Sequence, residues 1–170
     1  MSPVASLSPR EATQVNDRRD INKLRGQMQH LFYEAWMLDE TRKRLLAGVN
    51  DEVLRNAMIE SFCAHAHNLN EFFGEEGLGD TLKASSFTRG DYKWPATSEK
   101  RKALITKINK RISHLTQQRT LVAKEEITDQ DMTALYELLV ADLKKFMFHL
   151  RPELRVKPIA RASKSGDYLS

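Results

Sequence analysis

The sequence predicts an all-α fold, an antiparallel bundle of four main helices, and three observations lead to this prediction. Apolar residues recur at steps of three and four in four separate segments, which is the spacing of one helix face. No segment alternates apolar and polar residues over the length of a strand. The composition, with 41% hydrophobic and 29% charged residues, is that of an ordinary globular protein. Amphipathic helices of this kind bury their apolar stripes most simply against one another.

The first two helices are predicted over residues 17–47 and 51–73. Their apolar stripes consist of Ile21, Leu24, Met28, Leu31, Phe32, Ala35, Leu38, Leu45 and Leu46, and of Leu54, Met58, Phe62, Leu69, Phe72 and Phe73. Gly48 is expected to end the first helix, and Asn50 is the expected N-cap of the second. Acidic residues follow Asn50 directly, where the helix dipole favours negative charge.

Residues 80–97 are predicted to form an irregular loop, with room for a short fifth helix of one turn at 81–83. Phe87, Tyr92 and Trp94 are apolar anchors that would hold this loop against the helices. Structureless loops longer than about 12–15 residues are uncommon unless they are functional or disordered. The alternative is therefore that the loop is a working surface.

The last two helices are predicted over residues 98–119 and 129–150. The third carries Leu104, Ile105, Ile108, Ile112 and Leu115, and the fourth carries Met132, Leu135, Tyr136, Leu139, Leu143, Phe146, Met147 and Leu150. Thr128 and Asp131 resemble a capping box at the start of the fourth helix. Pro152 follows its end, where a helix cannot continue.

The chain is predicted to be one domain. Its 170 residues fall within the usual length of a single domain. Residues 17–151 hold the four helices, whereas 1–16 and 152–170 show no apolar periodicity. We expect a flexible N-terminal lead over 1–16 and a flexible basic tail over 152–170.

Cys63 is the single cysteine, so no intramolecular disulfide forms. The N-terminus lacks the basic start and apolar run of a secretory signal. No stretch approaches the roughly 18 consecutive apolar residues of a membrane span. We therefore expect a cytoplasmic protein with no membrane partner.

The net charge of +4 is unevenly distributed. Between Lys93 and Arg119 there are eight basic residues and one acidic residue, so that this unit carries about +7 and the remainder about −3. Lys100, Lys107, Arg111 and His114 gather beside the apolar stripe of the third helix, with Lys110 a little further round. This pattern indicates a surface for phosphate groups, in RNA or a nucleotide. The alternative is a solvated face, or one paired with acids of a neighbouring helix.

His65 lies within the apolar stripe of the second helix, with Ser61 and Asn68 at its edge. Such a histidine is commonly a hydrogen-bonded core residue; the alternative is that the three side chains open into a polar pocket. No metal site and no cofactor are expected, because the chain has no Cys pair, no HExxH and no Glu-x-x-His. It also has no phosphate-binding glycine motif and no GxSxG.

Two stretches carry a resemblance to known proteins. Residues 59–69 read IESFCAHAHNL, and residues 109–116 read NKRISHLT. The pair resembles a group of uncharacterised bacterial helical proteins and, more remotely, the HEPN superfamily. His67 stands where that group has an arginine. The resemblance implies a HEPN-like helical bundle that commonly forms a homodimer.

Many HEPN proteins cleave RNA without a metal ion by means of an Arg-x(4–6)-His motif. The resemblance therefore also implies this activity, if the motif is present. Arg25 and His30 are the pair that matches this spacing, but they lie in the first helix, whereas the family motif lies late in the bundle. Five residues of helix rotate their side chains by about 140°, which does not favour a shared pocket. In the expected region Asn109 precedes His114 by five residues, without an arginine.

Three functions are therefore considered. The first is a non-catalytic module that binds RNA, a nucleotide or a protein through the basic third helix, with Asn68 and Ser61 as further binding residues. The second is a metal-independent ribonuclease of toxin or phage-defence type with a degenerate motif, in which His114 is the acid and base. Arg111 or Lys110 would then stabilise phosphate charge, and His65 is a further catalytic candidate. The third is a structural or regulatory interaction bundle without ligand chemistry. Whether the protein is an enzyme stays open at this point.

Overall fold

The computed structural model describes residues 9–74, 82–90, 92, 98–112 and 127–155. Over these residues it contains the helices α1 (Pro9–Leu46), α2 (Glu52–Phe73), α3 (Glu99–Ile112) and α5 (Asp129–His149), with short 3-10 turns η1 (Ala84–Ser86) and η2 (Pro152–Leu154). The described residues form no named strand; Thr88 and Leu150 make one isolated β-bridge. The all-α class and its four main helices are confirmed.

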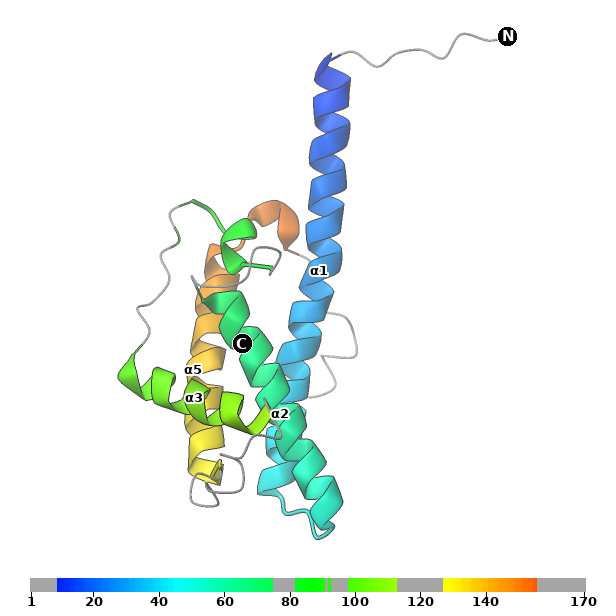
Figure 1. Ribbon diagram of the computed structural model, residues 1–170. Coiled ribbons are helices and arrows are strands. Elements are labelled where there is room, and N and C mark those ends of the chain that lie inside the picture. The colour runs from blue at the N-terminus through cyan, green and yellow to red at the C-terminus, as the bar shows by residue number, and fades with distance from the viewer. Residues whose placement is uncertain (1–8, 75–81, 91, 93–97, 113–126, 156–170) are drawn as a thin grey trace, which may run out of the picture.

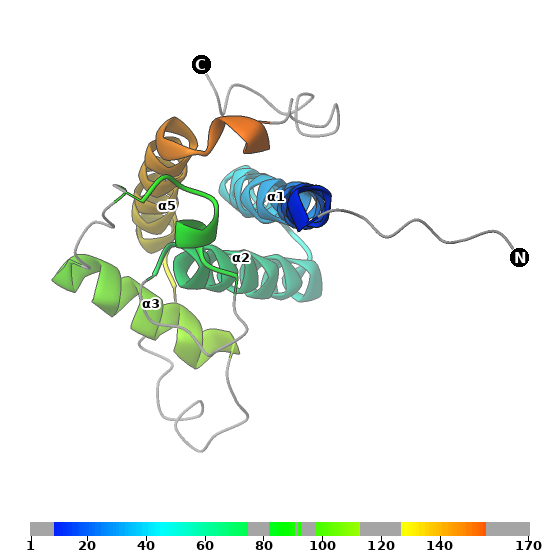
Figure 2. The ribbon, with the colours of Figure 1, turned by 90° about the horizontal axis from the view of Figure 1, so that it is seen from above.

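The arrangement of the helices is more varied than a simple antiparallel bundle. In Figure 1, α1 runs down the molecule while α2 and α5 both run up, so α1 is antiparallel to each of them. Helix α3 lies across α2 and α5, at a steep angle to both (Figures 1 and 2). A helix of this length crossing two others buries its stripe against both of them, and Leu104 and Ile108 supply that contact.

The helix boundaries follow local signals. Gly48 lies two residues after the end of α1 and has a φ of 89°, a left-handed conformation that glycine adopts without strain. The predicted N-cap of α2 was one residue off: Asp51, not Asn50, accepts a hydrogen bond from the Leu54 amide at 2.8 Å. The capping box of α5 is confirmed, with Thr128 and Asp131 bonded reciprocally.

Both predicted domain limits need correction. Helix α1 begins at Pro9, inside the segment 1–16 that was expected to be a lead. At the other end, residues 152–155 belong to the fold, because Leu154 is fully buried. The Arg25 guanidinium donates to the Glu153 carbonyl from Nε at 3.0 Å and from Nη2 at 2.8 Å. Residues 1–8 and 156–170 lie outside the described part.

The core is built around aromatic rings at one end of the bundle. Phe72 packs against Phe73, Phe87 and Phe146 with ring centroids 5.2–5.6 Å apart. Phe87 is therefore the loop anchor that the sequence predicts, and the buried Tyr92 is a second. The helical turn in this loop falls at Ala84–Ser86 rather than at 81–83. Trp94 and residues 113–119 of the predicted third helix lie outside the described residues.

The loop is joined to the end of α5 by backbone hydrogen bonds. The Arg89 amide donates to the His149 carbonyl at 3.3 Å, and the Arg151 amide donates to the Phe87 carbonyl at 3.0 Å. The loop segment at Phe87–Arg89 thus lies beside the last turn of α5. No helix in the described ranges combines the length and the apolar character that crossing a membrane requires.

Candidate functional site

The basic residues of α3 are largely used within the fold. Lys107 Nζ lies 2.9 Å from Asp131 Oδ2 of α5, and Arg111 Nη2 donates to Asn56 Oδ1 of α2 at 3.1 Å. Arg101 forms a buried ion pair with Asp142, and Lys102 pairs with Glu99 at 2.8 Å. Pairing with neighbouring helices was the alternative to a phosphate-binding face, and the described contacts favour it. Lys100 and Lys110 are exposed.

Asp131, the partner of Lys107, is kept in its charged form by its surroundings. Partial burial alone would raise the pKa of its carboxyl, but hydrogen bonds from Thr128 and Lys107 and the charge of Lys107 outweigh burial and lower the pKa. The same carboxylate closes the capping box of α5. Lys107 therefore pairs with the start of α5 while its side chain stays partly exposed.

Arg111 lies near the buried thiol of Cys63. Burial raises the pKa of Cys63 to about 12, an effect that the positive charge of Arg111 opposes only in part. The thiol is therefore protonated at neutral pH, and a protonated thiol is a poor nucleophile.

His65 and Asn68 converge on a carboxylate that the sequence analysis missed. His65 Nδ1 lies 2.7 Å from Glu34 Oε2 of α1, and Asn68 Nδ2 donates to the same oxygen at 3.1 Å. The Tyr33 ring packs edge-on to His65 with centroids 5.8 Å apart. Glu34 joins α1 to α2 across 31 residues of sequence. Its one sequence signal is its place at the edge of the apolar stripe, between Leu31 and Leu38.

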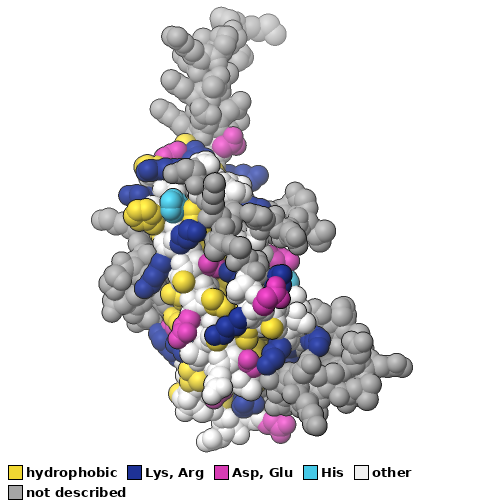
Figure 3. Space-filling view, turned by 90° about the vertical axis from the view of Figure 1, so that its left-hand side faces the viewer, with side chains coloured by type: hydrophobic (Ala, Val, Ile, Leu, Met, Phe, Trp, Pro, Cys, Tyr) yellow, Lys and Arg dark blue, Asp and Glu magenta, His cyan; other side chains and the backbone are white. Residues whose placement is uncertain are grey.

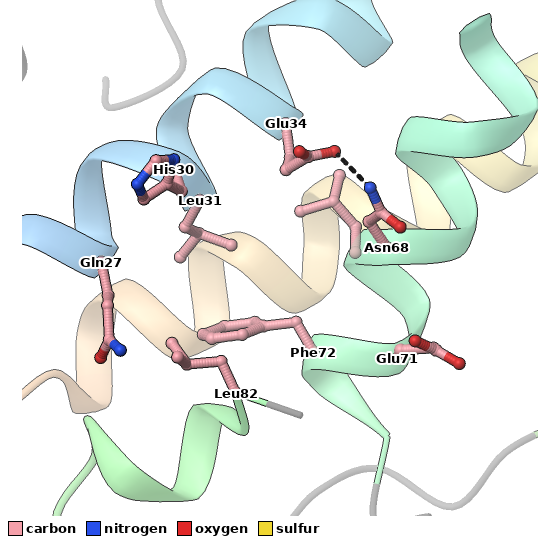
Figure 4. Close-up of a pocket in the computed structure, with 9 residues that line it drawn as sticks. Gln27, His30, Leu31, Glu34, Asn68, Glu71, Phe72 and Leu82 are labelled. Atoms are coloured by element: carbon pink, nitrogen blue, oxygen red, sulfur yellow. Dashed lines mark hydrogen bonds between the residues drawn. The ribbon is translucent and has the colours of Figure 1, made fainter. Parts of the chain in front are cut away.

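A groove between α1 and α2 begins at this carboxylate. It has a volume of about 480 Å³ and is lined by Gln27, His30, Leu31, Glu34, Asn68, Leu69, Glu71, Phe72 and Leu82. Figure 4 shows Leu31, Phe72 and Leu82 pointing toward one another on its floor, with Gln27, His30 and Glu34 along the α1 side. Asn68 thus reaches the groove, whereas Ser61 and His65 are not among its lining residues.

The surroundings of Glu34 stabilise its charged form. Burial would raise the pKa of this carboxyl, but the hydrogen bonds from His65 and Asn68 and the charges of His65 and His30 together lower it below its ordinary value of 4.5. A carboxyl with a lowered pKa contributes stability above its unfolded-state pKa and loses it as the pH falls through the folded-state value.

Acidification is therefore expected to remove the stabilising effect of Glu34. The free energy of unfolding of the wild type should exceed that of Glu34→Gln at about pH 7, and the difference should shrink as the pH falls below about 4.5. Urea unfolding of both proteins across this range measures the difference. A difference that does not change with pH would contradict the assignment.

The two stretches that carry the resemblance meet in the structure. His67 Nδ1 lies 2.9 Å from Asn109 Oδ1 of α3, and His67 Nε2 lies 3.3 Å from Glu71. His67 is therefore half-buried at the α2–α3 contact.

The candidate catalytic residues are not brought together among the described residues. Arg111 donates to Asn56 and His65 pairs with Glu34, on different contacts of α2. The Arg25 side chain donates to the Glu153 carbonyl, whereas the His30 side chain lines the groove. His114 lies outside the described part of the chain.

A second polar surface, also missed by the sequence analysis, lies at the end of α5. We call it the α5-end surface and define it by Arg89, Lys144, Lys145, Phe148, His149 and Arg151. Phe148 is 78% exposed, which is unusual for a phenylalanine in a helix. It packs beside His149, whose ring also packs beside Tyr92, with centroids 5.2 and 4.9 Å apart.

Positive charge surrounds this row of rings. Lys144 and Lys145 precede Phe148 by four and three residues and are exposed, with Lys145 Nζ 5.3 Å from the Tyr92 ring centroid. Arg89 and Arg151 lie on the paired backbone segments next to His149. Figure 3 shows this side of the molecule, where Lys and Arg side chains are spread among hydrophobic ones. Phe148 could have been noticed from the sequence, because it falls off the apolar stripe of the fourth helix.

The described residues contain no group of three His, Cys, Asp or Glu side chains that could hold a metal ion. No protein-family model, curated protein or solved structure matches the chain. The part of the chain that the structure describes is thus an all-α protein with four main helices, a mixed groove between α1 and α2 and a basic aromatic surface at the end of α5.

Proposed function

We propose that the protein is a non-catalytic RNA-binding module that takes single-stranded RNA on the α5-end surface. The observation that carries this proposal is the exposure of Phe148 next to two exposed lysines. A solvent-exposed aromatic ring within a basic surface is the arrangement on which single-stranded nucleic acids stack their bases and neutralise their phosphates.

The residues of this surface have distinct roles in the proposal. A base stacks on the Phe148 ring, while Lys144, Lys145 and Arg89 contact the flanking phosphates. Arg151 is partly engaged, because its Nε donates to Glu153 Oε1 at 3.0 Å. Stacking on an aromatic side chain is tolerant of base identity, so the module is expected to bind with little sequence preference.

The third helix keeps a supporting part in this proposal. Arg101 pairs with Asp142, one turn before Lys145, so the first turn of α3 packs beside this part of α5. Lys100 precedes Arg101 in the chain and is exposed, so the proposal includes it as a further cation near this part of α5. Lys107 and Arg111 hold α3 in place rather than contacting RNA, which moves the proposed interface from the middle of α3 to the end of α5. RNA as the ligand also agrees with the HEPN resemblance.

Removing the ring and the lysines should weaken binding in different ways. Phe148→Ala is expected to lower the affinity for a single-stranded RNA oligonucleotide about tenfold, since stacking contributes roughly 1–3 kcal/mol per base. Lys144→Ala with Lys145→Ala should reduce the slope of log K against log salt by about 1.4, or about 0.7 per lost phosphate contact. Fluorescence anisotropy at several salt concentrations measures both effects.

Matched controls lie at the opposite end of the molecule, at the start of α2. Val53→Ala removes an exposed apolar side chain, and Arg55→Glu reverses an exposed charge. Both variants should bind RNA like the wild type. Absence of binding at about 50 mM salt, or wild-type affinity in Phe148→Ala and in the double lysine variant, would overturn the proposal and favour an interaction bundle without ligand chemistry.

A further inference from the structure

The groove between α1 and α2 holds a carboxylate with one oxygen engaged and one available. Both hydrogen bonds to Glu34, from His65 and from Asn68, reach Oε2. Oε1 has no hydrogen-bond partner among the residues that the structure describes. The Glu34 side chain is 23% exposed and lines the groove, so a ligand can reach this oxygen. Figure 4 shows the carboxylate at one end of the groove, with Asn68 at the engaged oxygen.

The rest of the groove is suited to an aliphatic chain. Leu31, Phe72 and Leu82 form its floor, Leu69 also lines it, and Gln27 and His30 line the α1 side. Glu71 lies at the far edge, where it pairs with His67 and points away from the floor (Figure 4). An apolar floor that ends at a negative oxygen complements a ligand with an apolar body and a positive head.

We propose that this groove binds a primary alkylammonium group, with the ammonium donating to Glu34 Oε1 and the carbon chain lying on Leu31, Phe72 and Leu82. The hydrogen bonds at Oε2 select ammonium over guanidinium. A guanidinium binds a carboxylate most strongly through two parallel hydrogen bonds, one to each oxygen. Because His65 and Asn68 occupy Oε2, the site offers a single acceptor, which suits the compact charge of an ammonium.

The same head group occurs in free polyamines and in the lysine side chain of a peptide. The α5-end surface plays no part in this site, so the RNA proposal and the ligand proposal stand or fall separately. The chemistry to be tested first is the alkylammonium itself, and the two sources are then distinguished by separate ligands.

The full chain is titrated with each ligand at about pH 8, above the reference pKa of imidazole, and binding is measured from its amide NMR signals. n-Pentylammonium is expected to shift the signals of Glu34, Asn68 and Phe72 in a saturable way. n-Pentanol, which lacks the charge, and n-butylguanidinium, which loses its second parallel hydrogen bond here, should each bind at least tenfold more weakly. Comparable binding of n-pentanol would overturn the proposal, because the carboxylate would then play no part.

Two variants test the site and one controls for it. Glu34→Gln should weaken n-pentylammonium binding at least tenfold, while Glu137→Gln, on the exposed side of α5, should leave it unchanged. Gln27→Lys places a competing ammonium on the groove wall and should also weaken binding, which keeps the test valid if Glu34→Gln alters the local fold. Wild-type affinity in both groove variants would overturn the proposal.

Spermidine and Nα-acetyl-lysine methylamide are titrated in the same way to identify the source. Tighter binding of one of them than of n-pentylammonium supports the proposal and assigns the ligand class. Failure of both to shift the groove signals would overturn it, since each presents the head group that the site is proposed to recognise.

Discussion

Arg101→Met is expected to lower the free energy of unfolding by about 3–5 kcal/mol, because it leaves a buried carboxylate without its partner. Arg101 and Asp142 are 8% and 7% exposed, and the Arg101 guanidinium also donates from Nε to Asn70 Oδ1 at 2.8 Å. One side chain of α3 thus holds α2 and α5 together. Urea unfolding followed by circular dichroism measures the loss.

The double variant separates the cost of an unpaired charge from the worth of the pair. Arg101→Met combined with Asp142→Leu fills the space with apolar groups and leaves no buried charge, so most of the lost stability should return. Lys102→Met is the control, since Lys102 pairs with Glu99 on an exposed surface and such pairs contribute at most about 1 kcal/mol. A double variant as unstable as Arg101→Met would show that the polar contacts themselves stabilise the fold.

Phe146→Ala is expected to lower the free energy of unfolding by about 3–5 kcal/mol, the range for deleting a buried phenylalanine. Phe146 is completely buried and its ring packs against Phe72, Phe73 and Phe87, so it joins α5, α2 and the loop. Removal of the ring leaves a cavity that the surrounding rings fill only in part. Denaturant unfolding measures the effect.

The neighbouring Phe148 provides a matched control two residues further along α5. Phe148 is 78% exposed, and Phe148→Ala should change the free energy of unfolding by less than about 0.5 kcal/mol. The same two substitutions should have the opposite order of effect on RNA binding, when Phe146→Ala is measured under conditions where it is folded. Equal destabilisation by both substitutions would contradict the packing described for α5.

Local sequence signals account for most of the secondary structure. The periodicity of α2 and α5 predicted their extents within one residue, and the Thr128–Asp131 capping box was predicted from its spacing alone. These features depend on residues within a few positions of one another. The ends of the domain were harder to predict, because η2 is held by Leu154 and by Arg25 from a distant part of the chain.

The candidate sites depended on contacts that span much longer distances in sequence. Lys107 and Arg111 looked like a free basic surface on a helical wheel, yet their partners Asp131 and Asn56 lie 24 and 55 residues away. Glu34 was missed for the same reason, since its partner His65 is 31 residues away. A wheel places residues on a face but does not show which helix packs there.

By itself the sequence determined the all-α class, the four main helices and the concentration of positive charge around the third helix. Those properties follow from composition and from spacing within single helices. Only the tertiary structure decided that α3 crosses the others, that its Arg101 and Lys107 pair with acids of α5, and that Phe148 is exposed while Phe146 is buried. The physical reason is that burial and charge pairing depend on two surfaces packed together. The sequence of one helix describes only one of those two surfaces.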